Sequence, residues 1–396
     1  MKKIFLISCL LVLLFVQWTF AQSIETRGRY TYSLYAYEQE GSTFPIRVYQ
    51  FLRFSAEAKE WNNLSLNVSL RLLTQAQQEL DPFRAYRLSV SARNLFNNLL
   101  DFELGRQFLH AGIPFGSLDG LNLILKPGSH WTWQIFGGVE SNLFREFKVY
   151  KFDEAAVYGS ALTYRQFLNT DVQLAYLQKL KKSTNRWQVV GLNLNNYFLK
   201  TMRFLMQAHY DLVNSRLHRL YTSARFTPSR KISLSLFAKQ QYPQIYGDSF
   251  FRIFEVEQYT QAGLNVNYAI SPRYGLTAGL QYITVEEGSG QRVILGVNDL
   301  HGSVELLYET GDLGDQVSVM LDYGYEIWKD LVASIGVNYS RYRFEEIYEY
   351  ENQLANTVRL HYSISKNWKA DLEYQWLKNR FSDSDNRLLN HIHFIW

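Results

Sequence analysis

The dominant pattern along this chain is an alternation of apolar and polar side chains with a period of two. In residues 64–72, leucine and valine alternate with serine, asparagine and arginine, and residues 202–211, 317–326 and 354–364 repeat the pattern. Successive side chains of a β-strand point to opposite faces, so this period predicts strands with one apolar face and one polar face. No stretch repeats with the 3.6-residue period of a helix, and no change of composition indicates a second domain.

The connections between the predicted strands fall into two classes. Short turns are predicted near residues 61–63, 127–129, 168–170, 228–230, 271–273, 328–330 and 366–368. Longer polar loops are predicted near residues 39–44, 75–82, 110–118, 140–154, 242–255 and 348–353. The two classes alternate along the chain, which is typical of transmembrane barrels with short periplasmic turns and long outer loops.

Five tryptophans lie beside predicted short turns: Trp61, Trp131, Trp328, Trp368 and Trp396. Aromatic side chains gather where a barrel wall meets the lipid headgroups, so we expect these five to form an interface belt on the periplasmic side. The fold class predicted is therefore all-β, a single antiparallel transmembrane β-barrel over residues 22–396. Counting strands gives about 22, within a range of roughly 16 to 22 that depends on segments 121–126, 292–298 and 303–309. We expect an even number, because both chain ends are predicted on one side.

The N-terminus carries the features of a secretory signal peptide over residues 1–21. Lys2 and Lys3 precede an apolar run, and Thr19 and Ala21 place small side chains before the expected cleavage site. No later segment approaches the ~18 consecutive apolar residues of a membrane-spanning helix. Cys9 is the only cysteine, so the mature chain is expected to have no disulfide, thiolate metal site or cysteine nucleophile.

Charge and motifs exclude several classes of function. Removal of the two lysines of the signal peptide lowers the formal net charge from +4 to +2, which predicts no strong affinity for nucleic acid or other polyanions. We find no glycine-rich phosphate loop, zinc-binding helix motif or basic-aromatic patch, and we expect no cofactor. The predicted location is the outer membrane of a Gram-negative-type bacterium, with its lipid as one partner.

The last ten residues, 387–396, have the pattern of a closing barrel strand. Leu388, Ile392 and Phe394 share one face with the final tryptophan, and His391 and His393 share the other. Two histidines without a nearby carboxylate in the sequence do not make a metal site, so we expect them to line the interior. The segment resembles the C-terminal strands of outer-membrane proteins, which implies recognition by the barrel-assembly machinery.

The least generic stretch is LGRQFLHAGIPFGSLDGL at residues 104–121, where a strand is predicted to end, a glycine- and proline-bearing loop to follow, and a strand to restart at Asp119 and Gly120. This motif resembles porin-like outer-membrane barrels, including alginate-export-like channels. The resemblance implies a β-barrel channel and extends to Arg106, Gln107, Asp119 and Gly120. The chain departs from alginate-export proteins because no dense arginine conduit is identifiable. Arg106 and Asp119 are expected either to line a constriction or to pair with each other and brace the loop, and the second is favoured.

Charged residues at interior positions are unevenly distributed. Basic candidates are Arg47, Arg53, Lys59, Arg71, Arg87 and Arg93 on early strands, Arg203, Arg219, Arg225 and Lys239 on middle strands, and Arg359 on a late strand. Acidic candidates are Asp101, Glu103, Asp322, Glu326, Asp371 and Glu373. Opposed charged walls would orient polar solutes and tune ion selectivity, whereas pairing between adjacent strands would make the same residues structural.

Two His-x-Ser motifs raise the alternative of a lipid hydrolase. His361 and Ser363 have the spacing of a histidine and a nucleophile on one strand, but the local alternation turns them inward, away from lipid. His301 and Ser303 fall in a predicted turn. Neither pair has an evident third group to orient the histidine, so no catalytic residue is assigned and an enzyme is not expected.

The function predicted is a porin-like channel for passive diffusion of small polar or charged solutes. A polar interior behind an apolar exterior leaves a pore whose width and charge select what passes. With about 17 residues per strand and connection, little chain remains for a folded plug, but the loops at residues 110–118 or 242–255 are candidates to fold inward. The alternative from another class is a structural or surface-polymer-binding barrel without an open pore.

Overall fold

The computed structural model describes residues 24–38, 45–61, 63–75, 83–141, 147–242, 258–343 and 349–396. The predicted signal peptide and the loop predicted at residues 39–44 lie outside the described residues, as does nearly all of the loop at 242–255. No helix among the described residues is long and apolar enough to cross a membrane.

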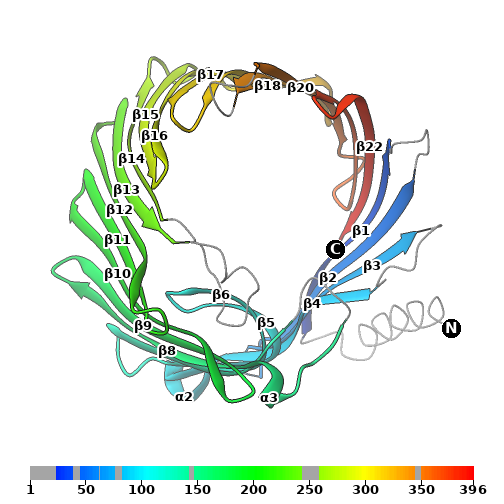
Figure 1. Cartoon of the computed structure of the whole chain (residues 1–396). Helices are drawn as coiled ribbons and strands as arrows, with labels where there is room; N and C mark the ends of the chain where they lie inside the picture. The colour runs from blue at the N-terminus through cyan, green and yellow to red at the C-terminus, as the bar shows by residue number, and fades with distance from the viewer. Residues whose placement is uncertain are drawn as a thin grey trace.

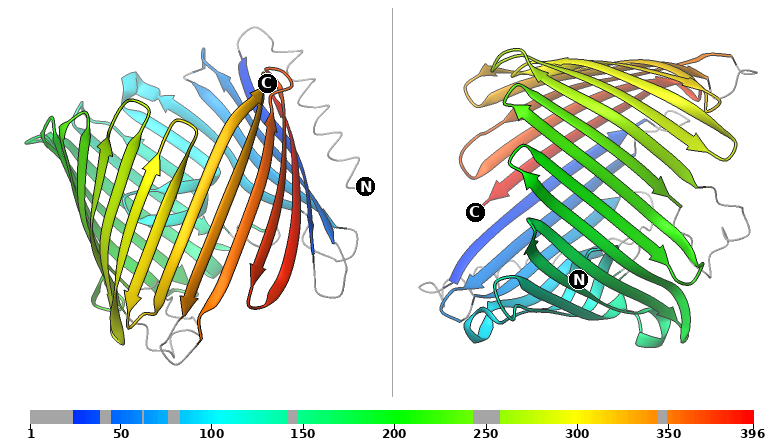
Figure 2. Two further views of the ribbon diagram at one scale, coloured as in Figure 1. Left: turned by 90° about the horizontal axis from the view of Figure 1, so that it is seen from above. Right: turned by 90° about the vertical axis from the view of Figure 1, so that its left-hand side faces the viewer.

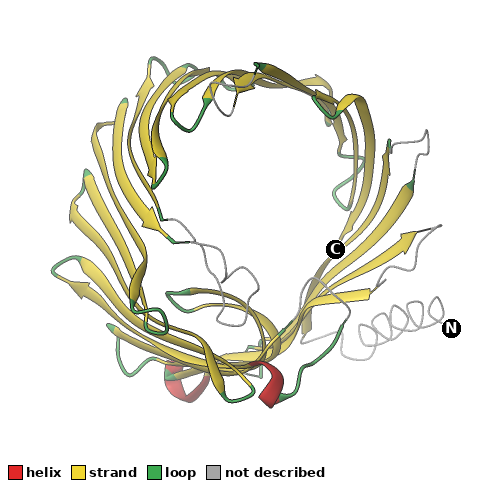
Figure 3. Ribbon diagram, viewed as in Figure 1, coloured by secondary structure: helices red, strands yellow, loops and turns green. Residues whose placement is uncertain are grey.

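Twenty-two strands follow one another along the described chain, with two four-residue helices. Figure 3 shows that strands make up nearly all of the wall. The first eleven strands are β1 (Ile24–Tyr37), β2 (Ile46–Ala58), β3 (Leu64–Gln75), β4 (Phe83–Asn94), β5 (Leu100–His110), β6 (Pro114–Leu125), β7 (Trp131–Glu140), β8 (Ala156–Phe167), β9 (Thr170–Lys181), β10 (Thr184–Leu199) and β11 (Met202–Asp211). The remaining strands are β12 (Arg216–Ser229), β13 (Ile232–Gln241), β14 (Tyr259–Ala269), β15 (Gly275–Val285), β16 (Gly288–Asn298), β17 (Gly302–Gly311), β18 (Asp315–Trp328), β19 (Leu331–Arg343), β20 (Glu351–Tyr362), β21 (Trp368–Asn379) and β22 (Ser382–Ile395). The helices are α2 (Leu95–Asn98) and α3 (Phe152–Ala155).

The strands form one closed antiparallel barrel. Each strand pairs with its neighbours in the chain, and β22 returns to β1, where Tyr30 pairs with Phe394 and Tyr37 with Arg387. Figure 1 looks into the resulting ring, and Figure 2 shows the strands tilted across its wall. Where neighbouring strands remain paired, closure leaves no sheet edge, so the wall satisfies its own backbone hydrogen bonds. The predicted fold and the even strand count are confirmed, including separate strands at the three doubtful segments.

The connections define two ends of the barrel. We call one end of the barrel the turn end. It holds the C-terminus and the turns that follow the even-numbered strands, such as β2–β3 and β20–β21. We call the opposite end the loop end. All connections at the turn end are short. The predicted asymmetry is only partly correct, because tight turns at residues 182–183, 286–287 and 380–381 lie at the loop end. The turn predicted at 228–230 begins later, since β12 continues through Pro228 to Ser229.

The register between neighbouring strands keeps the apolar and polar faces of the wall continuous around the whole ring. Opposite residues in an antiparallel pair point to the same side, so Leu174, Leu192 and Met206 share the outer face, as do Leu280, Leu295 and Leu306 farther along. Many of these outer side chains are exposed, Leu174 at 54% and Leu280 at 53%. The barrel therefore presents an apolar outer surface and a polar inner one.

The buried apolar cluster of the described residues lies where a hairpin inside the ring meets the inner face of the wall. The β5–β6 hairpin extends into the barrel, as Figure 1 shows, and its residues Leu109, Ala111, Ile113 and Leu118 pack against β7, β8, β9 and β10. β5 pairs with β4 only as far as Arg106, and β6 pairs with β7 only from Leu118. The hairpin beyond those points has left the wall.

Candidate functional site

The tip of the β5–β6 hairpin docks on the inner wall across β9, β10 and β11. The Asn193 amide donates a hydrogen bond of 2.9 Å to the Gly112 carbonyl oxygen. Ile113 lies directly over Gly191, where an added Cβ would come within 2.9 Å of its Cγ1. Because only glycine leaves that space, the wall is shaped to receive the tip. The loop predicted at residues 110–118 does fold inward, but it is a hairpin with a turn of three residues.

A buried lysine clamps the hairpin to the wall from β9. The Lys179 side chain is 2% exposed, and its Nζ lies 2.7 Å from Glu140 Oε1. The same ammonium lies 4.8 Å from the ring centre of Phe115 on the hairpin and 5.4 Å from that of Trp187 on the wall. A desolvated cation between aromatic rings and a carboxylate holds both surfaces together. The sequence alone does not indicate this lysine, since its partner Glu140 is 39 residues away.

The base of the hairpin is braced by the Arg106–Asp119 pair. Arg106 donates to both carboxylate oxygens of Asp119, at 2.6 Å and 2.5 Å, and to the carbonyl oxygens of Ala85 and Lys148 at 3.1 Å and 2.9 Å. Its guanidinium also lies over the Phe147 ring. Gly105, where β5 bends away from β4, has a φ of +115°, a conformation that favours glycine.

This geometry corrects the assignment of Arg106 and Gln107 as pore-lining residues. They are 3% and 1% exposed, so neither side chain lines the open interior of the barrel. The Gln107 amide donates to the backbone oxygens of Glu103 and Gly120. The carbonyl groups of a bent hairpin require such donors. Arg106, Gln107, Asp119 and Gly120 therefore brace the base of the hairpin, and for Arg106 and Asp119 this agrees with the pairing favoured from the sequence.

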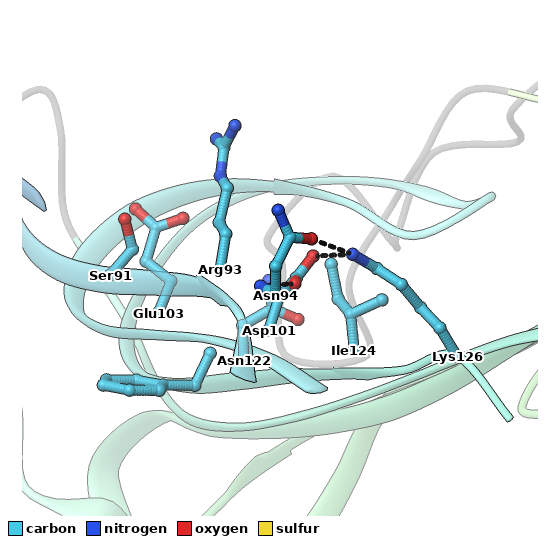
Figure 4. Close-up of a pocket in the computed structure, with 9 residues that line it drawn as sticks. Ser91, Arg93, Asn94, Asp101, Glu103, Asn122, Ile124 and Lys126 are labelled. Carbon is cyan, nitrogen blue, oxygen red and sulfur yellow. Dashed lines mark hydrogen bonds and ion pairs between the residues drawn. The ribbon is translucent and has the colours of Figure 1, made fainter. Parts of the chain in front are cut away.

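A cavity of about 370 Å³ lies on the inner side of β4, β5 and β6 near the turn end. Figure 4 shows Asp101, Asn94 and Lys126 joined by hydrogen bonds and an ion pair, with Lys126 Nζ 2.6 Å from Asp101 Oδ2. Arg93 extends away from this group and has no hydrogen-bond or ion-pair partner among the described residues. The cavity thus offers one uncompensated cation among paired charges.

The other predicted interior charges differ in their surroundings. Five are exposed on the inner face: Arg53, Arg203, Arg225, Asp322 and Arg359. Arg47, Arg71, Arg87 and Arg219 are partly buried there. Arg87 pairs with Glu103 at 2.7 Å and Arg359 with Glu373 at 2.6 Å. Those two pairs fit the structural role that was the alternative for each residue.

Arginines face arginines at several inner positions. Arg203 lies opposite Arg225, and Arg71 lies opposite Arg84. The Nε atoms of Arg47, Arg71, Arg84, Arg216 and Arg219 are buried and have no hydrogen-bond partner. These five lie toward the loop end, on β2 to β4 and on β12, and Figure 1 shows the inward hairpin between these two parts of the wall. Like charges in register repel unless anions or water screen them, so this region of the interior is electropositive.

The seam between β22 and β1 carries a chain of hydrogen bonds on the inner face. His361 Nδ1 lies 2.5 Å from Asp371 Oδ1, and His393 Nε2 lies 2.9 Å from Asp371 Oδ2. His393 Nδ1 then contacts Thr31 Oγ1 at 2.9 Å. His391 bonds to Ser33 at 2.7 Å. Among the described residues, no group of three or more histidine or acidic side chains is arranged to hold a metal ion.

Asp371 is the third group that sequence analysis did not find for the His361 motif. It stands on the next strand, directly opposite His361 in register. Counting outward from the turn at residues 363–367 would have placed Lys369 opposite His361, so the pairing with Asp371 depends on the register of β20 with β21. The five tryptophans Trp61, Trp131, Trp328, Trp368 and Trp396 all lie at the turn end.

Comparisons with known proteins leave the chain unassigned. No family model matches it, and neither does any curated protein. Among solved structures, it is similar to Acinetobacter baumannii OccAB1, with a TM-score of 0.46, 10% identity and coverage of 94% of this chain and 96% of that chain. It is also similar to Pseudomonas aeruginosa OpdK with vanillate, with a TM-score of 0.44, 11% identity and coverage of 94% and 98%. Similarity of this degree assigns neither a family nor a solute.

Proposed function

We propose that this chain is an outer-membrane channel through which small polar and charged solutes diffuse passively. The observation that carries the proposal is the exposure of charged side chains on the inner face, among them Arg53, Arg203 and Asp322. An interior filled by protein would bury or pair such groups. Their exposure indicates that water occupies the space between them.

The outer surface supports the membrane location. Leucine, valine and tyrosine side chains cover the outer positions of the strands, and the tryptophans at the turn end mark one boundary. Lipid is the environment in which such a surface is stable, because each exposed apolar side chain is disfavoured in water by about 25 cal/mol per Å². The partner for insertion is the barrel-assembly machinery, through β22.

The interior supports selection by size and charge. The docked hairpin narrows the passage beside β7 to β10, and the arginines of β2 to β4 and β12 attract anions toward the loop end. The channel is therefore expected to prefer anions over cations of equal size. The cavity beside Arg93 is a second place where an anionic group would bind transiently.

The test is conductance of purified, folded protein in a planar bilayer. Stable steps are expected, and replacing residues 108–116 by a two-residue turn is expected to raise the conductance, because those residues occupy the interior. Replacing the tight turn at residues 286–287 by Asn-Gly at the same end is the matched control and should change nothing. Absence of steps from correctly folded protein would favour the alternative, a structural or polymer-binding barrel.

A further inference from the structure

We infer that Ser363, His361 and Asp371 form a serine-hydrolase site on the inner wall at the turn end, which cleaves small water-soluble esters. Ser363 Oγ lies 3.4 Å from His361 Nε2, while His361 Nδ1 lies 2.5 Å from Asp371 Oδ1. The three groups are thus connected in the order nucleophile, base and orienting carboxylate. The proposed channel does not account for this arrangement.

The hydrogen-bond partners fix which atom carries each proton. A carboxylate only accepts hydrogen bonds, so His361 donates from Nδ1 and leaves Nε2 free to accept from the Ser363 hydroxyl. The second Asp371 oxygen accepts from His393 Nε2, and His393 Nδ1 accepts from Thr31. Asp371 is therefore held by two strands, which fixes the ring of His361 in the tautomer that a general base needs.

The proposed reaction is acyl transfer to serine followed by hydrolysis. Ser363 Oγ attacks the ester carbonyl carbon while His361 Nε2 takes its proton. The bond to the alcohol oxygen then breaks, and the alcohol leaves with that proton. Water attacks the acyl group on Ser363, gives its proton to His361 and releases the carboxylic acid, which restores the serine hydroxyl. Ester and water are consumed, and acid and alcohol are formed.

The position of the site selects water-soluble substrates. Leu360 and Tyr362 point to the outer face, so His361 and Ser363 open toward the interior and not toward lipid. The His361 side chain is 41% exposed, and that of Asp371 is 32% exposed. Lys369 shares the inner face opposite His393, and Arg29 interacts electrostatically with His393. These cations favour esters that carry an anionic group.

The test uses the folded, full-length barrel in detergent with a fluorophosphonate probe and p-nitrophenyl acetate. Labelling at Ser363, located by peptide mass spectrometry, is expected, together with ester hydrolysis that Ser363→Ala lowers by roughly 100-fold or more. Ser303→Ala is the matched control, since Ser303 has the same spacing from His301 but forms no hydrogen bond to a histidine among the described residues. That variant should keep full activity.

A positioning role for Asp371 is tested separately. Asp371→Asn should lower kcat with little change in KM and shift the pH profile of hydrolysis, whereas a residue that merely braces the seam would change neither. Heat-modifiable migration on gels confirms that each variant is folded. Absence of probe on Ser363 in folded barrel, or hydrolysis equal in wild type and Ser363→Ala, would overturn the proposal. Either result leaves the channel proposal intact, because conductance is measured independently.

Discussion

The Arg106–Asp119 pair is predicted to hold the β5–β6 hairpin inside the barrel. In Asp119→Ala, the Arg106 guanidinium, 3% exposed, loses both carboxylate hydrogen bonds and keeps only backbone partners. Leaving one charge of a buried pair without its partner costs about 3 to 5 kcal/mol. A loss of about 3 kcal/mol shifts the equilibrium between the docked and the released hairpin by roughly 150-fold. A hairpin that was docked about 99% of the time would then be released most of the time.

The assay combines thermal unfolding with single-channel recording. Asp119→Ala is expected to show a lower midpoint of unfolding and a larger or flickering conductance. Glu373→Ala is the matched control, because it breaks the Arg359 pair whose arginine is 51% exposed, and exposed pairs contribute only about 0 to 1 kcal/mol. The double substitution Arg106→Met with Asp119→Leu should restore docking, because an apolar pair leaves no buried charge. Wild-type unfolding and conductance in Asp119→Ala would refute this bracing role.

Three further predictions concern other parts of the barrel. Replacing both Arg203 and Arg225 by glutamine should lower the anion-to-cation permeability ratio measured from the zero-current potential in a salt gradient, and an unchanged potential would contradict an arginine field. Deleting residues 394–396 should reduce folded barrel in the outer membrane, because it removes the backbone pairing between Gly28 and Trp396 at the seam; unchanged heat-modifiable protein would exclude that role. Asp299 lies in the turn before β17, where hydrogen bonds from the backbone N–H groups of His301 and Gly302 lower the pKa of its carboxyl group. Its contribution to stability is present above the ordinary value of 3.8 and is lost as pH falls through the lowered pKa, so the difference in unfolding midpoint between wild type and Asp299→Ala should shrink in acid, and a difference independent of pH would argue against it.

The fold was largely accessible from the sequence because alternation is a local property. A period of two places each strand's apolar side outward whatever strand lies beside it. The segments at residues 292–298 and 303–309 show this, since both proved to be strands, β16 and β17, joined by a short turn. The position of the hairpin was harder to predict, because residues 104–121 indicate a bent strand and a turn but not the surface against which the turn packs.

The candidate site depends on register and on contacts between distant strands. Asp371 was recognised as an interior charge, but its bond to His361 requires the exact pairing of β20 with β21. Arg106 was recognised as part of a motif, but its burial requires the segment around Lys148 to cover it. Such contacts follow from how far each strand is staggered against the next, and single-strand patterns contain no information about stagger.

The sequence by itself determined a closed antiparallel barrel with an apolar exterior, because backbone groups in lipid have no other partners than neighbouring strands. Only the tertiary structure decided that the β5–β6 hairpin turns inward, that Lys179 and Asn193 receive it, and that Ser363, His361 and Asp371 meet at the seam. Alternation fixes the face on which each side chain lies. The neighbour that it meets there is decided by three-dimensional packing, because ring closure brings together residues that are hundreds of positions apart in the chain.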